Sequence, residues 1–411
     1  MARNIITALD VGTSTVQTVV AEHKKGEDGL RILGIGNVPS AGMRKGIVVD
    51  PEEITPAIRR SVHEAQKSAG VPVRSVWLAV GGAHISVSSS RGVVAVSRAD
   101  QEISQEDLKR VIAAAGTFVA KNSNKEILHM IPRDFKVDNE PGIKDPVGMH
   151  GVRLEVDTLI IECSTPFLKN LFKSVEGAGL KVEDYVFSSL AAAEAVLNKR
   201  QKELGTMLLD IGGGTAAFVV FEEGTPIHAG VIPVGGNHIT NDIAIGMRTH
   251  VDVAERVKLT YGSCLSSELP KRDNIRLSEF IDGEEGSYSR RELAEIVQAR
   301  LQDLYELVQK ELKKIDKTQL LPGGVVLIGG SSLLPGIINM AKSEVKLPVD
   351  LGQPRGFFEA LDEKLAPAFV TVLGVAKWAD LRRQEAGMGW NSHAVRLNQM
   401  PWLRWLKSLL P

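Results

Sequence analysis

An aspartate followed by glycines is the pattern best suited to chemistry in this chain. An apolar run ends at Asp210, and Gly212, Gly213, Gly214 and Thr215 follow before a second apolar run. Glycines let the backbone approach a ligand closely and direct successive N–H groups toward it, which suits a phosphate. The aspartate would repel a phosphate, but it can hold the water shell of the Mg²⁺ that accompanies a nucleotide. The pattern predicts a strand, a phosphate-binding turn and a second strand, although a glycine-rich β-hairpin without a ligand has the same composition.

A second copy of this pattern lies in the first residues of the chain. Residues 9–22 align with residues 209–222 without a gap, and seven of the fourteen positions are identical: Leu, Asp, Gly, Thr, Val, Val and Glu. The earlier copy consists of Asp10 followed by Gly12, Thr13, Ser14 and Thr15. A hairpin without a ligand has no reason to recur with its acid, whereas two lobes that hold one nucleotide between them each need a phosphate turn.

Two further turns can add contacts to a nucleotide. Gly329, Gly330 and Ser331 follow an apolar run, and their backbone can meet a base or a ribose. A turn that opens a helix offers free N–H groups, and it is expected at Gly235, Gly236 and Asn237. Glu255 and Lys258 are three residues apart on one helical face, so both can point at one ligand, although a surface ion pair would have the same spacing.

The turns after Asp10, after Asp210 and at Gly329 resemble, in that order, the phosphate 1, phosphate 2 and adenosine motifs of the superfamily of actin, sugar kinases and heat-shock chaperone ATPases. The resemblance implies that Asp10 and Asp210 orient hydrated Mg²⁺, that Glu255 and Lys258 meet the ribose or base of ATP, and that the third turn frames the adenine. No GxxxxGK[ST] occurs in the chain and no GxGxxG follows a strand, so P-loop and Rossmann folds are disfavoured.

The chain departs from this superfamily at one position. Chaperone relatives carry a Glu-Pro pair before the alanine-rich helix that precedes the second phosphate turn, and the acid helps to position water. This chain has Ser188 in that place. A serine cannot replace a carboxylate as a base, so weak or absent ATP hydrolysis is expected.

Length and composition describe a globular protein of more than one domain. The chain has 411 residues, of which 43% are hydrophobic and 24% are charged. Because 49 basic residues balance 50 acidic ones, nothing in the charge favours a nucleic acid partner. Cys163 and Cys264 lie far apart in apolar or serine-rich surroundings, which is typical of buried thiols in a reducing compartment. No signal peptide and no apolar run of about 18 residues occurs, so a cytoplasmic protein that does not span a membrane is expected.

Hydrophobic periodicity and capping residues predict the order of elements. A three-strand meander is expected at 4–10, 15–22 and 30–38, then a helix from the N-cap Asp50 to about Gly70. The following block is expected to hold strands at 84–90, 93–97, 127–137 and 153–161 and a helix from the Ser104 capping box. Further on, a helix is expected at 289–314 and a closing helix at 366–378. Arg290, Arg291 and Arg300 are expected on a solvated face of the first of these, with the binding of an acidic peptide as the alternative.

These elements divide the chain into a first lobe, an α+β insertion, a second lobe and a tail. The predicted ranges are 1–82, 164–205 and 374–381 for the first lobe, 83–163 for the insertion, 206–234 and 319–373 for the core of the second lobe, 235–318 for its smaller subdomain, 382–398 for a flexible linker, and 399–411 for a terminal helix. The insertion carries no phosphate turn or catalytic cluster, so it is interpreted as an interaction domain, with a structural elaboration as the alternative.

The terminal residues form a short amphipathic pattern. On a helical wheel Trp402, Leu403, Trp405, Leu406, Leu409 and Leu410 fall in one arc of about 160°, and Arg404, Lys407 and Ser408 occupy the rest. Tryptophans suit the headgroup boundary of a bilayer, and the basic residues favour anionic lipids. Burial of this face would stabilise by about 6 to 12 kcal/mol, against about 1 to 2 kcal/mol for ordering each residue. One copy would therefore bind a membrane reversibly, and firm attachment would need several copies in one assembly. The alternative is a terminal helix that packs on the core.

Taken together, the nucleotide turns, the insertion and the tail resemble the FtsA family of bacterial cell-division proteins along the whole chain. The resemblance implies an α/β, actin-like (ribonuclease H-like) two-lobed ATPase fold that binds ATP with Mg²⁺ between its lobes. It also implies filaments on the cytoplasmic face of the inner membrane at the division septum, and tethering of the C-terminal peptide of FtsZ. In the family that peptide docks on the smaller subdomain, where Arg300 is the expected contact, and later division proteins are expected to bind the 83–163 insertion. The alternatives are a small-molecule kinase of the same superfamily and a scaffold for pilus assembly.

Overall fold

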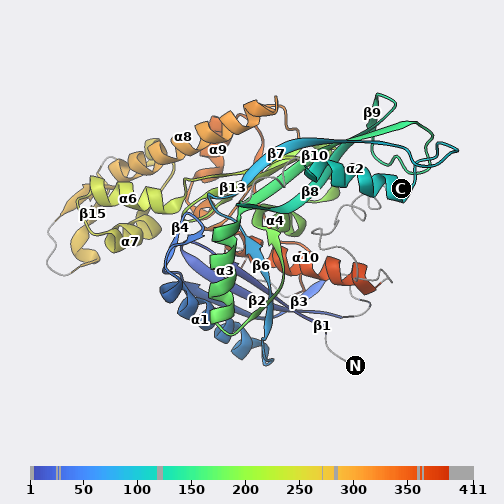
Figure 1. Ribbon diagram of the computed structural model, residues 1–411. Helices are drawn as coiled ribbons and strands as arrows, with labels where there is room; N and C mark the ends of the chain where they lie inside the picture. Colours follow the sequence, from blue (N-terminus) through green and yellow to red (C-terminus); the bar gives the residue numbers. More distant parts are fainter. Residues whose placement is uncertain are drawn as a thin grey trace.

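The computed structural model describes two lobes and an insertion (Figure 1). The described residues are 4–24, 26, 29–117, 124–270, 272–281, 286–358, 362 and 365–387. In Figure 1 the first lobe, with its blue strands, lies at the bottom, and the yellow and orange helices of the second lobe lie at the left and top. The teal insertion extends to the upper right. The predicted membrane residues 399–411 and most of the predicted linker lie outside the described residues.

A five-stranded sheet forms the centre of the first lobe. Its strands are β1 (Asn4–Val11), β2 (Thr15–His23), β3 (Leu30–Pro39), β6 (Ser75–Val80) and β11 (Lys181–Phe187), in the order β11-β6-β1-β2-β3. The first three strands form the expected antiparallel meander, and β6 and β11 add to it in parallel. The helices of this lobe are α1 (Pro51–Ala69), α3 (Thr165–Gly177), α4 (Ser188–Val196) and α10 (Val370–Gly387). α1 packs on β2 and β3 and beside α3, while α10 packs beside α4.

The sheet of the second lobe repeats this topology. Its strands are β12 (Thr206–Ile211), β13 (Ala216–Glu222), β14 (Thr225–Ile232), β17 (Val325–Ile328) and β18 (Val349–Leu351), in the order β14-β13-β12-β17-β18. As in the first lobe, the first three strands are antiparallel neighbours and the last two are parallel. The internal repeat that the sequence reveals over fourteen residues therefore extends to a whole sheet.

Helices dominate the rest of the second lobe. They are α5 (Lys199–Leu204), α6 (Gly236–Gly246), α7 (Val251–Tyr261), the long α8 (Arg290–Lys314) and α9 (Ile337–Val345). A two-stranded sheet of β15 (Asn274–Arg276) and β16 (Ser287–Ser289) leads into α8. The 3₁₀ turns are η1 (Ser266–Glu268), η2 (Leu277–Glu279), η3 (Gly330–Leu333) and η4 (Ala366–Phe369).

The insertion is a four-stranded sheet with one helix. Its elements are β7 (Ser86–Ala95), α2 (Gln105–Thr117), β8 (Lys125–Val137), β9 (Glu140–Ile143) and β10 (Arg153–Ser164), and the strand order is β7-β10-β8-β9. The prediction of two strands at 84–90 and 93–97 is wrong, since β7 is continuous. Gly92 does not turn the chain; it lets α2 approach, because a Cβ there would lie 2.0 Å from the carbonyl oxygen of Val111. The Ser104 capping box is confirmed by reciprocal bonds between Ser104 and Asp107.

The closing helix is longer than predicted. A 3₁₀ turn (η4) takes the place of its first residues, and α10 then continues to Gly387, so residues 382–387 of the predicted linker are helical. A tertiary contact explains the extension: the guanidinium of Arg383 donates to the carbonyl oxygen of Ile5 at 2.6 Å and to Glu183 at 2.9 Å. Local composition does not reveal such an anchor.

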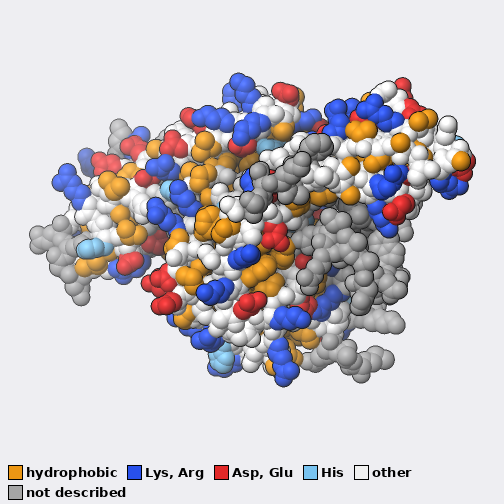
Figure 2. Space-filling model, in the orientation of Figure 1, with side chains coloured by type: hydrophobic (Ala, Val, Ile, Leu, Met, Phe, Trp, Pro, Cys, Tyr) orange, Lys and Arg blue, Asp and Glu red, His pale blue; other side chains and the backbone are white. Residues whose placement is uncertain are grey.

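Buried apolar side chains form one large cluster in the first lobe and another in the second. The first cluster also includes Val219 and Phe221 of the second lobe, on β13, which packs against α4 between the lobes. On the face in Figure 2, positive and negative side chains are interspersed. Within the described part of the chain, no helix is both long and apolar enough to cross a bilayer.

Candidate functional site

The two acid-glycine turns occupy matching positions in the two sheets. The first joins β1 to β2 and the second joins β12 to β13. Each is closed by the same backbone hydrogen bond: the N–H of Gly12 donates to the carbonyl of Thr15 at 3.0 Å, and that of Gly212 to Thr215 at 3.0 Å. The predicted strand, turn and strand are therefore present twice with the same local geometry.

These two turns meet across the boundary between the lobes. A Cβ added to Gly213 would lie 1.9 Å from Oγ of Ser14, and one added to Gly214 would lie 2.6 Å from Oγ1 of Thr13. The hydroxyl of Ser14 also donates to Oδ1 of Asn237 at 2.9 Å. The tertiary structure thus brings together two turns about 200 residues apart in sequence.

The start of α6 is tied to the second turn. The N–H groups of Gly236 and Asn237 donate to the carbonyls of Gly212 and Gly213 at 2.9 and 2.8 Å. The N–H of Gly235 donates to Nδ1 of His238 at 3.1 Å. These three N–H groups were expected to be free, yet each has a partner in the protein. At this position it is the side chain of Asn237 that faces the other lobe.

The two aspartates lie where the strands enter the turns, and both are half-buried. Burial, together with the negative charge of the neighbouring Asp210, raises the pKa of Asp10 to about 7. Burial also raises the pKa of Asp210, while a hydrogen bond of 2.7 Å from the hydroxyl of Thr371 opposes that shift. Among the described residues no donor is bonded to the carboxylate of Asp10. Two close carboxylates without a protein cation form a natural site for a divalent ion.

Magnesium fits this pair only through water. The described residues contain no group of three or more acidic, histidine or cysteine side chains that could enclose a metal. Mg²⁺ is often held by one or two carboxylates while it keeps several waters and binds phosphate oxygens. Asp10 and Asp210 match that arrangement, because they supply two charges and leave the remaining positions to water and a ligand.

The third turn lies against the second. Gly329 has φ of 88°, and a Cβ there would lie 2.3 Å from Oδ1 of Asp210, so glycine is required twice over. The hydroxyl of Ser331 donates to the carbonyl of Gly212 at 3.3 Å. A Cβ on Gly330 would meet nothing within 4 Å, so this residue faces open space.

Glu255 and Lys258 on α7 point toward the start of α6. The ammonium of Lys258 lies 2.7 Å from the carboxylate of Glu255, 2.8 Å from the hydroxyl of Thr240 and 3.3 Å from the carbonyl of Gly236. Lys258 is buried, so the alternative of a surface ion pair does not hold for it. The pair instead joins α7 to the helix that carries Asn237.

Arg300 on α8 does not lie on a free solvated face. Its guanidinium forms two hydrogen bonds, of 2.6 and 3.0 Å, with the carboxylate of Asp242 on α6, and it also reaches Asp303. The side chains of Arg300 and Asp242 are 29% and 27% exposed. Arg290 is likewise paired, with Asp273. The prediction of a solvated basic face is therefore wrong for these two arginines, because the neighbouring segments supply acids.

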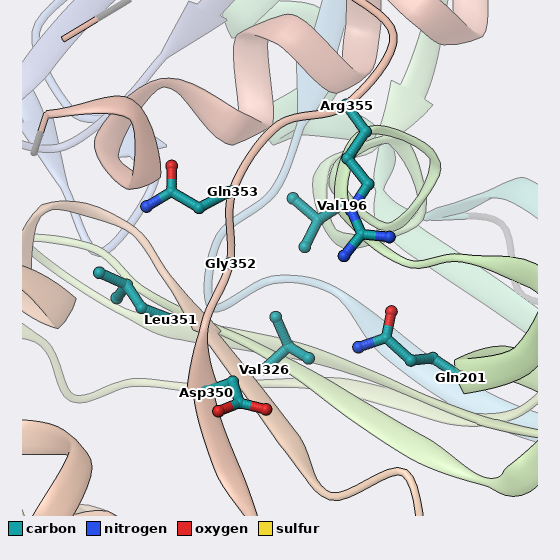
Figure 3. Close-up of a pocket in the computed structure, with 8 residues that line it drawn as sticks. All are labelled: Val196, Gln201, Val326, Asp350, Leu351, Gly352, Gln353 and Arg355. Atoms are coloured by element: carbon teal, nitrogen blue, oxygen red, sulfur yellow. The ribbon is translucent and has the colours of Figure 1, made fainter. Parts of the chain in front are cut away.

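A cavity of about 320 Å³ lies away from the turns, where the chain passes between the lobes (Figure 3). It is lined by residues from the ends of α4, β17 and β18, from α5 and from the segment after β18, among them Gln201, Asp350 and Arg355. None of the predicted nucleotide residues lines it.

Sequence reasoning missed three residues of this site. Thr371 bonds to Asp210, and Thr240 bonds to both Glu255 and Lys258. Lys45 precedes Gly46, whose N–H donates to Thr13 of the first turn. Thr371 left a weak signal, since it is the one polar residue in the apolar stretch 366–376. Thr240 and Lys45 left none, because their neighbours come from distant segments. The predicted membrane residues from Trp402 to Leu410 lie outside the described part of the chain.

Comparison with known proteins gives consistent results. A family model described as cell division protein FtsA matches residues 207–374, and one described as an SHS2 domain inserted in FtsA matches residues 82–162. The cell division protein FtsA of Pseudomonas aeruginosa is 37% identical over 385 residues, covering 93% of this chain and 91% of that protein. The corresponding protein of Bacillus subtilis is 37% identical, covering 90% and 82%, and that of Escherichia coli K12 is 33% identical, covering 91% and 90%.

Solved structures support the same fold. A type IV pilus biogenesis complex of PilM and PilN matches with a TM-score of 0.66 at 16% identity, over 91% of this chain and 98% of the other. MreB5 of Spiroplasma citri bound to ADP matches with a TM-score of 0.55 at 13% identity, over 94% and 99%. The predicted actin-like two-lobed fold with an inserted domain is confirmed.

Proposed function

Because this chain belongs to the FtsA family of cell division proteins, we propose that it binds ATP with Mg²⁺ between its lobes and serves as a membrane-bound adaptor in division. The meeting of the two acid-glycine turns carries this proposal, since it brings both predicted phosphate turns and both aspartates to one place. MreB5, which shares the fold, has been solved with ADP and with AMPPNP.

Different residues of the site are proposed to contact the phosphates, the Mg²⁺, the ribose and the adenine. The turns of Gly12, Thr13, Ser14, Thr15 and of Gly212, Gly213, Gly214, Thr215 hold the phosphates, and Asp10 and Asp210 hold the water shell of Mg²⁺. Glu255 and Lys258 contact the ribose or base, and Gly329, Gly330 and Ser331 frame the adenine. Because ligand groups would approach Ser14 and Asn237 from between the lobes, nucleotide binding and the closure of the lobes are coupled.

Hydrolysis is proposed to be weak. Ser188, at the start of α4, is buried and lies near Gly81: a Cβ on Gly81 would be 2.8 Å from its hydroxyl. This serine takes the place of the acid that positions water in chaperone relatives, and a hydroxyl cannot accept a proton as a carboxylate does. ATP then acts mainly as a ligand that sets conformation and assembly.

Assembly and membrane attachment are proposed to depend on one another. Actin-like filaments would present many copies of the amphipathic segment 399–411 to the cytoplasmic face of the inner membrane at the septum. Each copy binds weakly, and multivalency raises the apparent affinity by about 10² to 10⁴. Trp402, Leu403, Trp405, Leu406, Leu409 and Leu410 enter the bilayer, and Arg404 and Lys407 meet anionic lipids.

Two partner surfaces are proposed. The smaller subdomain of the second lobe receives the C-terminal peptide of FtsZ, and the insertion receives later division proteins. At Arg300 an acidic peptide must compete with Asp242, which already holds the guanidinium through two hydrogen bonds. An Asp242→Asn variant is therefore expected to bind the FtsZ peptide more tightly, provided that Arg300 makes the contact.

Co-sedimentation with vesicles that contain anionic lipids tests the adaptor function. The full chain is compared with a chain ending at Asn398, each with and without ATP. Pelleting that is lost on truncation, and filaments that form on vesicles only with ATP, are expected. Equal pelleting of the two chains would refute the membrane role and favour the kinase alternative, for which no aspartate base has been identified.

A further inference from the structure

A two-residue turn in the first lobe is fixed beside the first phosphate turn. It joins β4 (Met43–Arg44) to β5 (Ile47–Val48) and consists of Lys45 and Gly46. The N–H of Gly46 donates to Oγ1 of Thr13 at 2.8 Å, so the hairpin is bonded directly to that turn.

The other side of the hairpin packs on the segment that follows β6. The carbonyl of Lys45 accepts a bond of 3.0 Å from the N–H of Ala83, and a Cβ on Gly46 would lie 2.5 Å from Cα of Gly82. These contacts hold the backbone of Lys45 in one place relative to the predicted phosphate site.

Lys45 adopts a conformation that its side chain disfavours. Its φ is 50° and that of Gly46 is 72°, so both residues of the turn are left-handed. Turns of this kind usually carry asparagine, aspartate or glycine at the first position, because a longer side chain is strained there. Strained residues that the surrounding structure holds in place gather at functional sites.

The ammonium of Lys45 has no partner among the described residues, although the side chain is half-buried. It lies close enough to His238, at the start of α6 on the second lobe, for its positive charge to act on that imidazole. Burial is the main cause of the lowered pKa of that histidine, and the positive charge of Lys45 lowers it further. Lys45 thus stands near both lobes where they meet.

None of the residues proposed so far supplies a free positive charge to the phosphates, so an ammonium group such as that of Lys45 could do so. The proposed phosphate contacts are backbone N–H groups and hydroxyls, the two aspartates are negative, and Lys258 is already paired with Glu255. A nucleoside triphosphate with one Mg²⁺ still carries net negative charge, which a nearby ammonium would neutralise.

We propose that Lys45 binds the terminal phosphates of the nucleotide, reaching across from the strained hairpin that Thr13 and Ala83 hold in place. This inference rests on the proposed function and adds to it a residue that neither the acid-glycine pattern nor the superfamily motifs contain. The strain in the turn is explained because glycine or asparagine would relax the backbone but remove the charge.

Calorimetric binding of ATP, ADP and adenosine, with Mg²⁺ present, tests the assignment. Lys45→Asn keeps a residue that tolerates the turn, Lys45→Gly removes the strain, and Lys45→Arg retains the charge. Lys67→Gln, on the exposed last turn of α1, is the matched control. The Asn and Gly variants should lose about ten- to a hundredfold in affinity for ATP and ADP, the range for a hydrogen bond to a charged group. Adenosine binding should not change, and Lys45→Arg and Lys67→Gln should stay within about threefold of the unaltered chain.

The outcomes separate this assignment from the proposed function. Equal losses for adenosine and ATP would show that Lys45 only supports the fold, and unchanged ATP affinity in both neutral variants would show that it does not meet the phosphates. Either result overturns the assignment while nucleotide binding stands. If the unaltered chain itself failed to bind ATP, the proposed function would fall, and the assignment with it.

Discussion

Gly12, Thr13 and Ser14 in the first turn match Gly212, Gly213 and Gly214 in the second, within two sheets of the same strand order. At these three positions only the first turn carries side chains. The second has glycine where the hydroxyls of Thr13 and Ser14 need room, so the two turns are complementary rather than equivalent. Two related elements can thus be complementary: one has side chains where the other has glycine, and this lets the lobes meet at the turns.

The aspartates of the two turns differ as well. Asp210 accepts a hydrogen bond from Thr371, while Asp10 has no such donor among the described residues, and burial raises its pKa to about 7. Near neutral pH the first acid is therefore partly protonated, and a cation between the two would favour its ionised form.

The largest expected effect on ATP binding comes from removing the second aspartate. Asp210→Ala leaves Mg²⁺ with one carboxylate and deprives Thr371 of its acceptor, so affinity for ATP with Mg²⁺ should fall more than about a hundredfold. Calorimetry measures this loss. An ATP affinity equal to that of the unaltered chain would remove Asp210 from the site.

The complementarity of the turns can be broken from the glycine side. Gly213→Ala puts a methyl group within contact of Ser14 Oγ, so the lobes cannot close and ATP binding should weaken about ten- to a hundredfold. The double variant Gly213→Ala with Ser14→Gly should recover much of the loss, because it exchanges the side chains between the turns. Absence of recovery would show that the turns do not act as a pair.

The raised pKa of Asp10 can be tested through the pH dependence of the stability of the fold. The folded pKa of Asp10 is raised, so the folded chain binds more protons than the unfolded chain between about pH 4 and 7, and stability falls as pH rises through that range. Asp10→Asn removes this penalty and should raise the free energy of unfolding at pH 8 by about 4 kcal/mol, with no gain at pH 4. Urea unfolding of the nucleotide-free chain at both pH values measures it, and a gain that is the same at pH 4 and pH 8 would contradict the shift.

The smallest effect is expected at the partner of the second acid. Thr371→Val removes the hydrogen bond to Asp210 while keeping the shape of the side chain, and it should destabilise the fold by about 1 kcal/mol. Thermal unfolding measures the change, and Thr371→Ser serves as the control that keeps the hydroxyl. Equal destabilisation by Val and Ser would indicate a packing effect instead.

Much of the fold was predicted because the signals were local. The strands on each side of both turns, the Asp50 cap of α1 and the Ser104 capping box depend on residues within a few positions of one another. Predictions were wrong where distant segments decide. Two strands were predicted at 84–90 and 93–97, but β7 is continuous and its Gly92 makes room for α2, and Arg383 extends α10 by binding β1. Arg300 was expected in solvent, but Asp242 lies on a different helix.

The sequence by itself determined that two acid-glycine turns exist, that they are related, and which residue types each offers a nucleotide. Those properties depend only on a few adjacent side chains and on the conformational freedom of the glycine backbone. Only the tertiary structure decided that the glycines of one turn make room for the hydroxyls of the other, and that the carboxylates of Asp10 and Asp210 are close enough to interact. It also placed Lys45 next to the first turn and near His238 of the second lobe. Such relations depend on distances between segments far apart in the chain, which are set when the two sheets pack around α4 and not by any local pattern.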